Sequence, residues 1–285
     1  MKQVLFRIPG LGVPVYSFGL LVALAVFAGL MLAVRRSRKE GLDPNVVYDM
    51  AGWLVAGGLV GARLFYVVEY WGEKVTTVGG VLRVWEGGIV LYGALVGAVV
   101  GLLAFRAVRR FPVLATLDAL APSAALGVAV GRVGCFLNGC CYGKFCQTPW
   151  LAVRFPKGSP PWLAEVAQNA IPEDAAASLP LHPTQLYSAL DGLVLLALLS
   201  AYYPLRRRDG EVAGLLLLAY PVARFVLDVF RDDERPLILG LTIAQVSSLF
   251  LFAFGLLFWS YLSRRPAGRV ADRVKPIGAP HDELA

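Results

Sequence analysis

The sequence is short of charged residues. Only 16% of its 285 residues are Asp, Glu, Lys or Arg, whereas 57% are hydrophobic and the mean hydropathy is +0.63. Because a soluble domain usually carries about 25% charged residues, this composition excludes an ordinary soluble domain and indicates a chain that lies in lipid. Internal repeats and low-complexity tracts are also lacking. Many transporters are built from inverted repeats, so their absence disfavours a transporter.

Long apolar runs take the place of charge. A bilayer core of ~30 Å requires roughly 20 apolar residues per helix. The sequence therefore predicts an all-α polytopic membrane protein with about seven transmembrane helices, at Gly12–Val34, Tyr48–Trp71, Gly88–Phe105, Val113–Leu137, Leu186–Tyr203, Ala213–Phe230 and Leu239–Leu262. The first run is too long for a signal-peptide core and precedes its basic cluster, so we expect a retained helix.

The positions of Lys and Arg predict the orientation. These residues are concentrated in the connections after the first, third, fifth and seventh runs. Since cytoplasmic loops carry an excess of Lys and Arg, the N-terminus is predicted outside (periplasmic) and the C-terminus in the cytoplasm. This asymmetry explains the net charge of +7 without a nucleic-acid partner. We expect one membrane domain over residues 1–265, with an external connection over 139–183, and a flexible cytoplasmic tail over 266–285.

Several arginines fall at membrane depth, where a charge costs about 3 kcal/mol at the bilayer centre. Such residues usually face a cavity, a partner or a substrate. One alternative is structural: Arg224 would pair with Asp228 four residues later, and Arg63 would pair with Asp118 or extend towards the membrane surface.

A second alternative is a binding site. Arg132, Arg224 and Arg231 all fall towards the predicted external half of the protein. Guanidinium groups in a partly dry site match a phosphate group, and the abundant phosphates of a membrane are lipid headgroups. We therefore expect these three arginines to bind a lipid phosphate.

One histidine and four cysteines lie at the same predicted end. His182 opens the fifth run and is either structural or an acid–base candidate. The cysteines are at positions 135, 140, 141 and 146. An oxidising exterior favours disulfides, unpaired structural cysteines are the other leading interpretation, and a zinc site fits the vicinal pair at 140 and 141 less well.

Five sequence blocks occur in a specific order: GARLFYVVEY (61–70), WEGGIVLYGALVG (85–97), GRVGCFLNGCCYG (131–143), HPTQLYSALDG (182–192) and ARFVLDVFRDDERP (223–236). In these blocks the sequence resembles the prolipoprotein diacylglyceryl transferases of bacterial inner membranes. The resemblance implies transfer of a diacylglyceryl group from phosphatidylglycerol to the lipobox cysteine of a prolipoprotein signal peptide, with release of glycerol phosphate. It implies no metal and no soluble cofactor.

The resemblance also implies site residues. Arg132, Arg224, Tyr92 and His182 are the catalytic candidates. The residues expected to bind phosphatidylglycerol are Arg132, Arg224, Arg231, Asn138, Gly143, Gly93, Asp228 and Arg63. Such a protein would be a multi-pass protein of the inner (cytoplasmic) membrane.

Some positions depart from the family pattern. Tyr92 stands where the family often has histidine, and Ser17 and Phe18 replace a Trp-Tyr pair. Cys135 replaces an asparagine and Cys140 a glutamate, and Asp228 replaces a longer glutamate. These changes spare the expected phosphate-binding residues and alter those nearest the proton transfer. A divergent member acting on another lipid or acceptor, or a non-catalytic lipid-binding protein, is therefore an alternative function.

Overall fold

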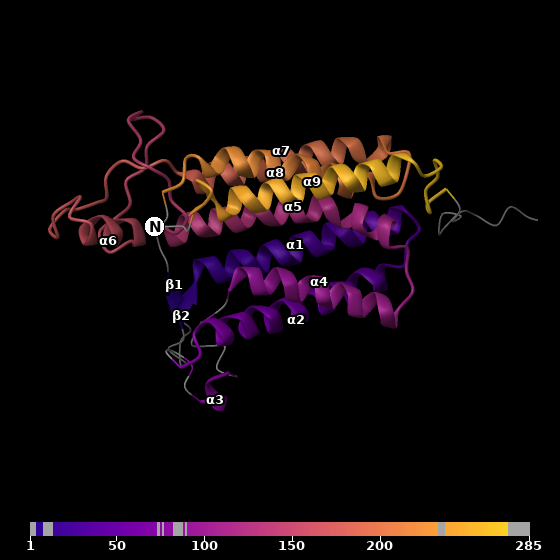
Figure 1. Cartoon of the computed structure of the whole chain (residues 1–285), viewed down its shortest axis with the longest axis horizontal. Helices are drawn as coiled ribbons and strands as arrows, with labels where there is room; N and C mark the ends of the chain where they lie inside the picture. The colour runs from indigo at the N-terminus through magenta and orange to yellow at the C-terminus, as the bar shows by residue number, and fades with distance from the viewer. Residues whose placement is uncertain are drawn as a thin grey trace, which may run out of the picture. The chain divides into compact units, whose positions relative to one another are not determined.

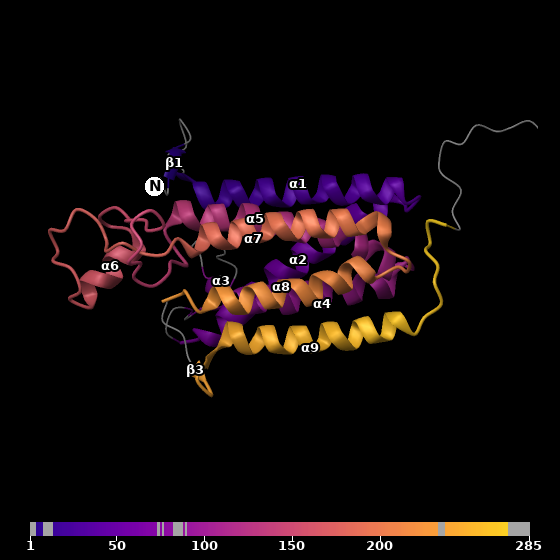
Figure 2. The same cartoon turned by 90° about the horizontal axis from the view of Figure 1, so that it is seen from above.

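The computed structural model describes residues 4–7, 14–72, 75, 77–81, 88, 90–232 and 237–272 (Figures 1 and 2). The chain forms two compact units. Of the described residues, the first unit contains those up to Ala33 and those from Leu117 onwards, and the second contains those from Val34 to Thr116.

Each of the seven predicted runs overlaps a long helix in the described residues. These helices are α1 (Ser17–Lys39), α2 (Pro44–Glu69), α4 (Leu91–Val108), α5 (Val113–Asn138), α7 (Thr184–Tyr202), α8 (Glu211–Asp228) and α9 (Ile243–Ser263). The shorter elements are α3 (Val78–Val81), α6 (Pro160–Ala167), the 3-10 helix η2 (Tyr203–Leu205), and two antiparallel pairs, β1 (Val4–Arg7) with β2 (Pro14–Tyr16) and β3 (Leu237–Ile238) with β4 (Leu241–Thr242).

The helices establish a polytopic membrane protein. Five helical stretches of the described residues are long and apolar enough to cross a bilayer, and the apolar part of α4 is shorter. The five are α1, α2, α5, α9 and the stretch from Thr184 to Leu205. Helix α8 is less apolar because it carries Glu211, Arg224 and Asp228.

In the second unit, glycines bring α2 and α4 into direct backbone contact. A Cβ atom at Gly61 would lie 2.7 Å from the Cα of Gly97, and Gly57 and Gly101 are similarly crowded. Small residues spaced four apart allow this approach between membrane helices. These glycines therefore serve the close packing of α2 against α4.

In the first unit, α8 packs beside both α7 and α9 (Figures 1 and 2). Leu195 and Leu199 of α7 form a buried cluster with Val212 of α8 and Ala125 of α5. A Cβ at Gly192 would lie 2.7 Å from the backbone nitrogen of Ala129, so α7 and α5 also touch closely. The connection between α5 and α7 contains α6 and lies beyond the ends of these helices (Figure 2).

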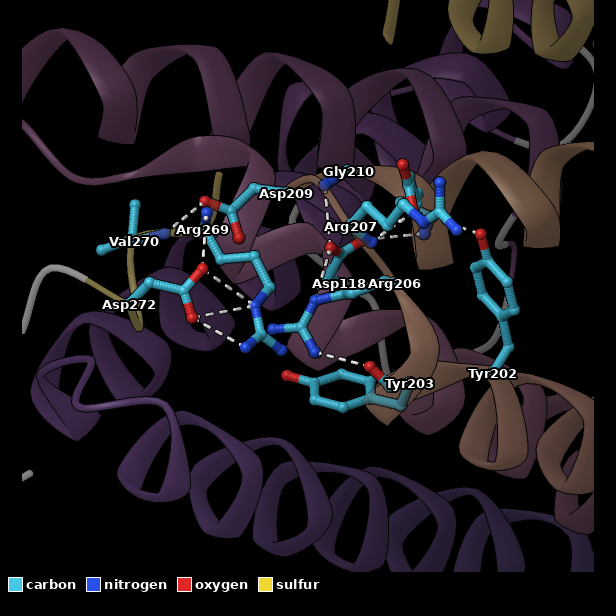
Figure 3. A network of polar contacts seen from close by, with 12 residues as sticks. Asp118, Tyr202, Tyr203, Arg206, Arg207, Asp209, Gly210, Arg269, Val270 and Asp272 are labelled. Carbon is cyan, nitrogen blue, oxygen red and sulfur yellow. Dashed lines mark hydrogen bonds and ion pairs between the residues drawn. The ribbon is translucent and has the colours of Figure 1, made fainter. Parts of the chain in front are cut away.

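A buried ion pair connects the N-terminal part of α5 to the turn between α7 and α8. Asp118 lies 3.3 Å from the Nε of Arg206, and both side chains are almost wholly buried. The Asp118 carboxylate also accepts the backbone N–H of Gly210 at 2.8 Å (Figure 3) and that of Ala213 at 2.9 Å. Arg206 stacks on Tyr203, 4.0 Å from the ring centroid. Asp118 is thus paired with Arg206, which replaces the suggested pairing with Arg63.

The start of the predicted cytoplasmic tail is bound to this same region. The N–H of Val270 donates to the Asp209 carboxylate at 2.8 Å (Figure 3), and the N–H of Gly268 donates to the Arg207 carbonyl at 3.0 Å. Residues 273–285 of the tail lie outside the described residues.

Candidate functional site

The end of the first unit opposite Asp118 joins three of the motif blocks at Gly143. Its N–H donates to the His182 carbonyl at 3.0 Å, and Gly143 forms an antiparallel bridge with Arg231. The next residue, Lys144, donates its N–H to Phe230 at 2.8 Å and its side chain to Val229 at 2.9 Å. The loop after α5 therefore binds both the start of α7 and the end of α8.

Glycine is required at position 143 because the three segments leave no space for a side chain. A Cβ there would lie 2.7 Å from the His182 Cβ, from the His182 carbonyl oxygen and from the Phe230 carbonyl oxygen. Real Cβ atoms essentially never approach so closely. Gly143 was predicted as a lipid-binding residue. In the structure it is the position where the loop after α5, the start of α7 and the end of α8 meet, and we call this meeting point the joint.

Arg132, Arg224 and Arg231 are brought together by this joint. Arg224 experiences the positive charges of both Arg231 and Arg132, and those same two arginines act electrostatically on Cys141. Arg132 comes from the last two turns of α5, Arg224 from α8 and Arg231 from just beyond it. Three like charges repel one another, so the cluster favours a bound anion.

Arg132 is the member of the cluster that most needs a ligand. Its side chain is half-buried, and it forms no ion pair or hydrogen bond with any residue that the structure describes. Burying a charge without a partner is costly. A phosphate oxygen would supply the missing acceptor.

Arg224 has a structural partner as well as a charged neighbourhood. It forms an ion pair of 3.0 Å with Asp228, whose side chain is fully buried. Asp228 also accepts a hydrogen bond from the hydroxyl of Thr242, the residue that caps α9 through Gln245. The expected ion pair is therefore present, and Asp228 positions Arg224 from the junction of α8 and α9.

His182 lies in an aromatic setting beside the joint. Its Nδ1 is 3.1 Å from the Tyr187 hydroxyl, and its ring packs edge-on against Phe230 with centroids 5.5 Å apart. Phe230 immediately precedes Arg231 in the sequence. His182 therefore lies at the edge of the arginine cluster.

Three thiols share the same end of the unit. The sulfur atoms of Cys135, Cys140 and Cys141 all lie within 4.8 Å of one another. All four cysteines are free thiols, as in the unpaired interpretation. Hydrogen bonds from the Cys135 and Cys140 thiols, followed by the charges of Arg231 and Arg132, lower the pKa of the Cys141 thiol well below its ordinary value. Asn138, expected to bind lipid, hydrogen-bonds the Cys140 side chain.

Two residues that the sequence did not single out hold these thiols in place. The Thr184 hydroxyl donates to the Cys141 carbonyl and the Gln185 amide donates to the Cys140 carbonyl, both at 2.8 Å. Both side chains are buried in the first turn of α7. Their presence in the block HPTQ was the available signal, because buried polar residues at a helix start need partners.

An apolar groove involves α8, the helix that also carries Arg224. It has a volume of about 250 Å³ between α8 and α9 and is lined by Pro221, Val222, Phe225, Val226, Ser248, Leu249 and Phe252. Phe225 adjoins Arg224 in the sequence. A lipid with an anionic headgroup requires both a charged cluster and an apolar surface, and α8 contributes residues to both.

The remaining site predictions fall in the second unit. Arg63 is buried and donates to the carbonyls of Val81, Gly88 and Gly80 at 2.8, 3.1 and 2.6 Å. The close approach that Gly93 permits is that of α2, so its role there is helix packing. Tyr92 lies in the first turn of α4, and its side chain lies outside the described residues.

Comparison with known proteins gives one consistent answer. The profile of the prolipoprotein diacylglyceryl transferase family matches residues 3–261. Phosphatidylglycerol–prolipoprotein diacylglyceryl transferases that resemble the chain include that of Clostridium tetani, 32% identical over 256 residues, which cover 90% of this chain and 96% of that protein. That of Thermosynechococcus vestitus is 36% identical over 255 residues, covering 87% and 90%, respectively.

Proposed function

The chain belongs to the prolipoprotein diacylglyceryl transferase family, and we infer from this membership that it transfers a diacylglyceryl group from phosphatidylglycerol to the lipobox cysteine of prolipoproteins. The observation that carries this conclusion is the family match over residues 3–261. It is a membrane transferase of lipoprotein biosynthesis. The products are a thioether-linked prolipoprotein and glycerol phosphate.

We propose that the arginine cluster binds the phosphate of the lipid. In the reaction the acceptor thiolate forms a C–S bond to the terminal carbon of the diacylglyceryl group. The C–O bond breaks, and its electron pair leaves with the glycerol phosphate. Because negative charge grows on the phosphate as it leaves, Arg132, Arg224 and Arg231 would bind the transition state more tightly than the substrate. Arg132, which has no ion-pair or hydrogen-bond partner among the described residues, is the residue that supports this role most directly.

Asp228 would position Arg224 in this site, and His182 would act at its edge. Asp228 is buried and pairs with Arg224, so it orients the guanidinium rather than repelling the phosphate from the surface. His182 is our acid–base candidate among the residues at this end, with Nδ1 held by Tyr187. Tyr92 is retained as a second candidate from the sequence alone.

The apolar groove between α8 and α9 would receive part of an acyl chain. Its lining side chains are almost all apolar, and it lies on the helix that carries Arg224. A lipid placed this way would bury hydrocarbon in the groove while its phosphate meets the arginines. We propose this pose because α8 contributes residues to both features.

We further propose seven membrane-spanning helices with the N-terminus outside, in the bacterial inner membrane. The basic residues at the end of α1 and those in the α7–α8 turn support this orientation, since such residues favour the cytoplasmic side. In that orientation the arginine cluster is external. One domain over 1–265 remains our interpretation of the functional unit.

The test uses cells depleted of their own diacylglyceryl transferase. The chain is expressed with a lipobox reporter, and mass spectrometry follows thioether lipid on the reporter cysteine. We expect wild type and the exposed-arginine control Arg207→Ala to modify the reporter and Arg132→Ala to fail. An unmodified reporter with wild type would overturn the function, and equal modification by Arg132→Ala would overturn the phosphate role.

A further inference from the structure

The three clustered thiols lie beside the arginines but play no part in phosphate binding. Cys135, Cys140 and Cys141 have their sulfurs within 4.8 Å of one another. Zinc binds thiolate sulfur at about 2.3 Å in tetrahedral geometry, so sulfurs on one zinc ion lie about 3.8 Å apart. Only a small movement of the thiols is needed to reach that spacing.

The backbone around the thiols is built to hold them. Thr184 and Gln185 fix the carbonyls of Cys141 and Cys140 at 2.8 Å, and the N–H of Cys140 donates to the Cys135 carbonyl at 3.2 Å. Cys141 has φ of 60°, a left-handed conformation that is strained for a residue with a side chain. These contacts come from α5 and α7, and they fix the backbone that carries the three thiols.

The fourth cysteine is not part of this group. Cys146 is buried and its thiol donates to the Thr148 carbonyl at 3.5 Å. Three protein ligands with an open fourth position are typical of catalytic zinc sites, whereas structural sites are closed by four. Because Cys146 does not join the three clustered cysteines, a metal ion bound by them would have a fourth position open to an outside ligand.

The charges around the three thiols are also compatible with a bound metal ion. A divalent ion with three thiolates carries a net charge of −1, and Arg132 and Arg231 lie close enough to act electrostatically on Cys141. The arginines would offset that charge. A disulfide would use only two of the three thiols.

We propose that Cys135, Cys140 and Cys141 form a three-thiolate site for a thiophilic divalent ion of the zinc type, with its fourth position open to the acceptor thiol. This inference rests on the proposed function, because it assigns the site to the acceptor half of the same reaction. The acceptor thiol binds the ion and loses its proton to water. Its sulfur then attacks the lipid carbon, and the C–O electron pair leaves with the glycerol phosphate.

Metal binding should increase the fraction of the acceptor cysteine that is thiolate at pH 7. A free thiol with pKa about 8.5 is only about 3% thiolate at pH 7. A metal-bound thiol is deprotonated outright, which raises the thiolate about thirtyfold at that pH. The site would thereby raise the thiolate fraction of the acceptor cysteine, without replacing the acid–base role proposed for His182.

Cobalt binding to the purified full chain tests the site without reference to transfer. The reduced protein in detergent is titrated with Co²⁺, whose visible absorption reports tetrahedral thiolate ligation. Wild type and the matched control Cys146→Ala should bind one ion per chain, and Cys135→Ala, Cys140→Ala and Cys141→Ala should each lose the band. Equal spectra for wild type and a variant lacking all three cysteines would overturn the site, as would a Cys135–Cys140 disulfide in the freshly purified protein.

Two lipobox peptides test the open position. A peptide with the acceptor cysteine should change the Co²⁺ spectrum, and the same peptide with serine should not. Identical spectra with both peptides would overturn the assignment of the fourth position. If the cysteine peptide binds the ion but wild type transfers no lipid, the proposed function fails while the metal site stands. When zinc is added, transfer at pH 7 should be about thirtyfold lower in the three cluster variants than in wild type, and Cys146→Ala should transfer lipid like wild type.

Discussion

Gly143 and Arg231 pair as an antiparallel β-bridge, which places the loop after α5 directly against the end of α8. The neighbouring Lys144 adds a side-chain hydrogen bond of 2.9 Å to the Val229 carbonyl. Arg132 is fixed by α5 and Arg231 by this bridge, so the bridge determines whether the two guanidinium groups can meet one phosphate. The arginine site therefore depends on a position that contributes no side chain.

We expect Gly143→Ala to abolish or strongly reduce transfer. The added methyl group would meet His182 and Phe230 at 2.7 Å, and overpacking of this kind costs about 1–3 kcal/mol. Reporter lipidation and thermal unfolding in detergent measure the two effects. The control is Gly127→Ala in α5, where a Cβ has nothing within 4 Å. Full transfer activity in Gly143→Ala would contradict the role of the joint.

Asp228→Asn should weaken use of phosphatidylglycerol. The carboxylate is buried and pairs with Arg224 at 3.0 Å, and removing one charge from such a pair costs about 2–5 kcal/mol. The asparagine still accepts the Thr242 hydroxyl, so the start of α9 is kept. Kinetics with varied lipid should show a raised KM, and Thr242→Val, which leaves the ion pair in place, should change KM less. An unchanged KM in Asp228→Asn would remove Asp228 from the positioning of Arg224.

The sequence predicted the helices well because hydrophobic length is a strong signal. It placed the first helix five residues too early at both ends: α1 runs from Ser17 to Lys39, since Arg and Lys are good helix formers and the helix continues until the left-handed Gly41. Arg224 with Asp228 could be predicted because the two residues are four apart on one helix.

Contacts between distant segments could not be predicted in this way. Thr184 and Gln185 bind carbonyls more than forty residues earlier in the chain, and their separation gives no periodic signal. Arg63 was grouped with the other membrane arginines because composition alone cannot distinguish a guanidinium bound to carbonyls from one that awaits a ligand. Local sequence patterns thus identified the charged residues in the membrane, and the tertiary structure showed which of them have protein partners.

The ion pair between Asp118 and Arg206 should be a major contribution to stability. Both side chains are buried, so Arg206→Met leaves a carboxylate without its counter-charge, at a cost of about 3–5 kcal/mol. We expect a clear loss of thermal stability in detergent. The adjacent control Arg207→Ala, whose side chain is exposed, should unfold like wild type. The double variant Asp118→Asn with Arg206→Met should recover part of the loss, and its failure to do so would indicate that the pair is not coupled.

Glu165 should make the connection between α5 and α7 less stable as pH rises. Burial raises the pKa of the Glu165 carboxyl above its usual range. The hydrogen bond that the carboxylate accepts from the Leu179 N–H at 2.9 Å and the charge of Arg154 lower this pKa, but their effects are smaller. The folded state thus binds the proton more tightly than the unfolded state does. The resulting stability is fully present below the unfolded pKa of about 4.5 and is lost as pH passes the folded pKa.

Glu165→Gln should remove this pH dependence, because the amide oxygen can still accept from Leu179 but carries no charge at any pH. Hydrogen exchange at the Leu179 amide, corrected for intrinsic rates, measures local opening from pH 4 upwards. Wild type and the exposed control Glu173→Gln should show opening that increases with pH, whereas Glu165→Gln should show a constant value. A wild-type amide that opens more readily at acid pH would reverse the sign and show that the hydrogen bond to the carboxylate outweighs the cost of burying its charge.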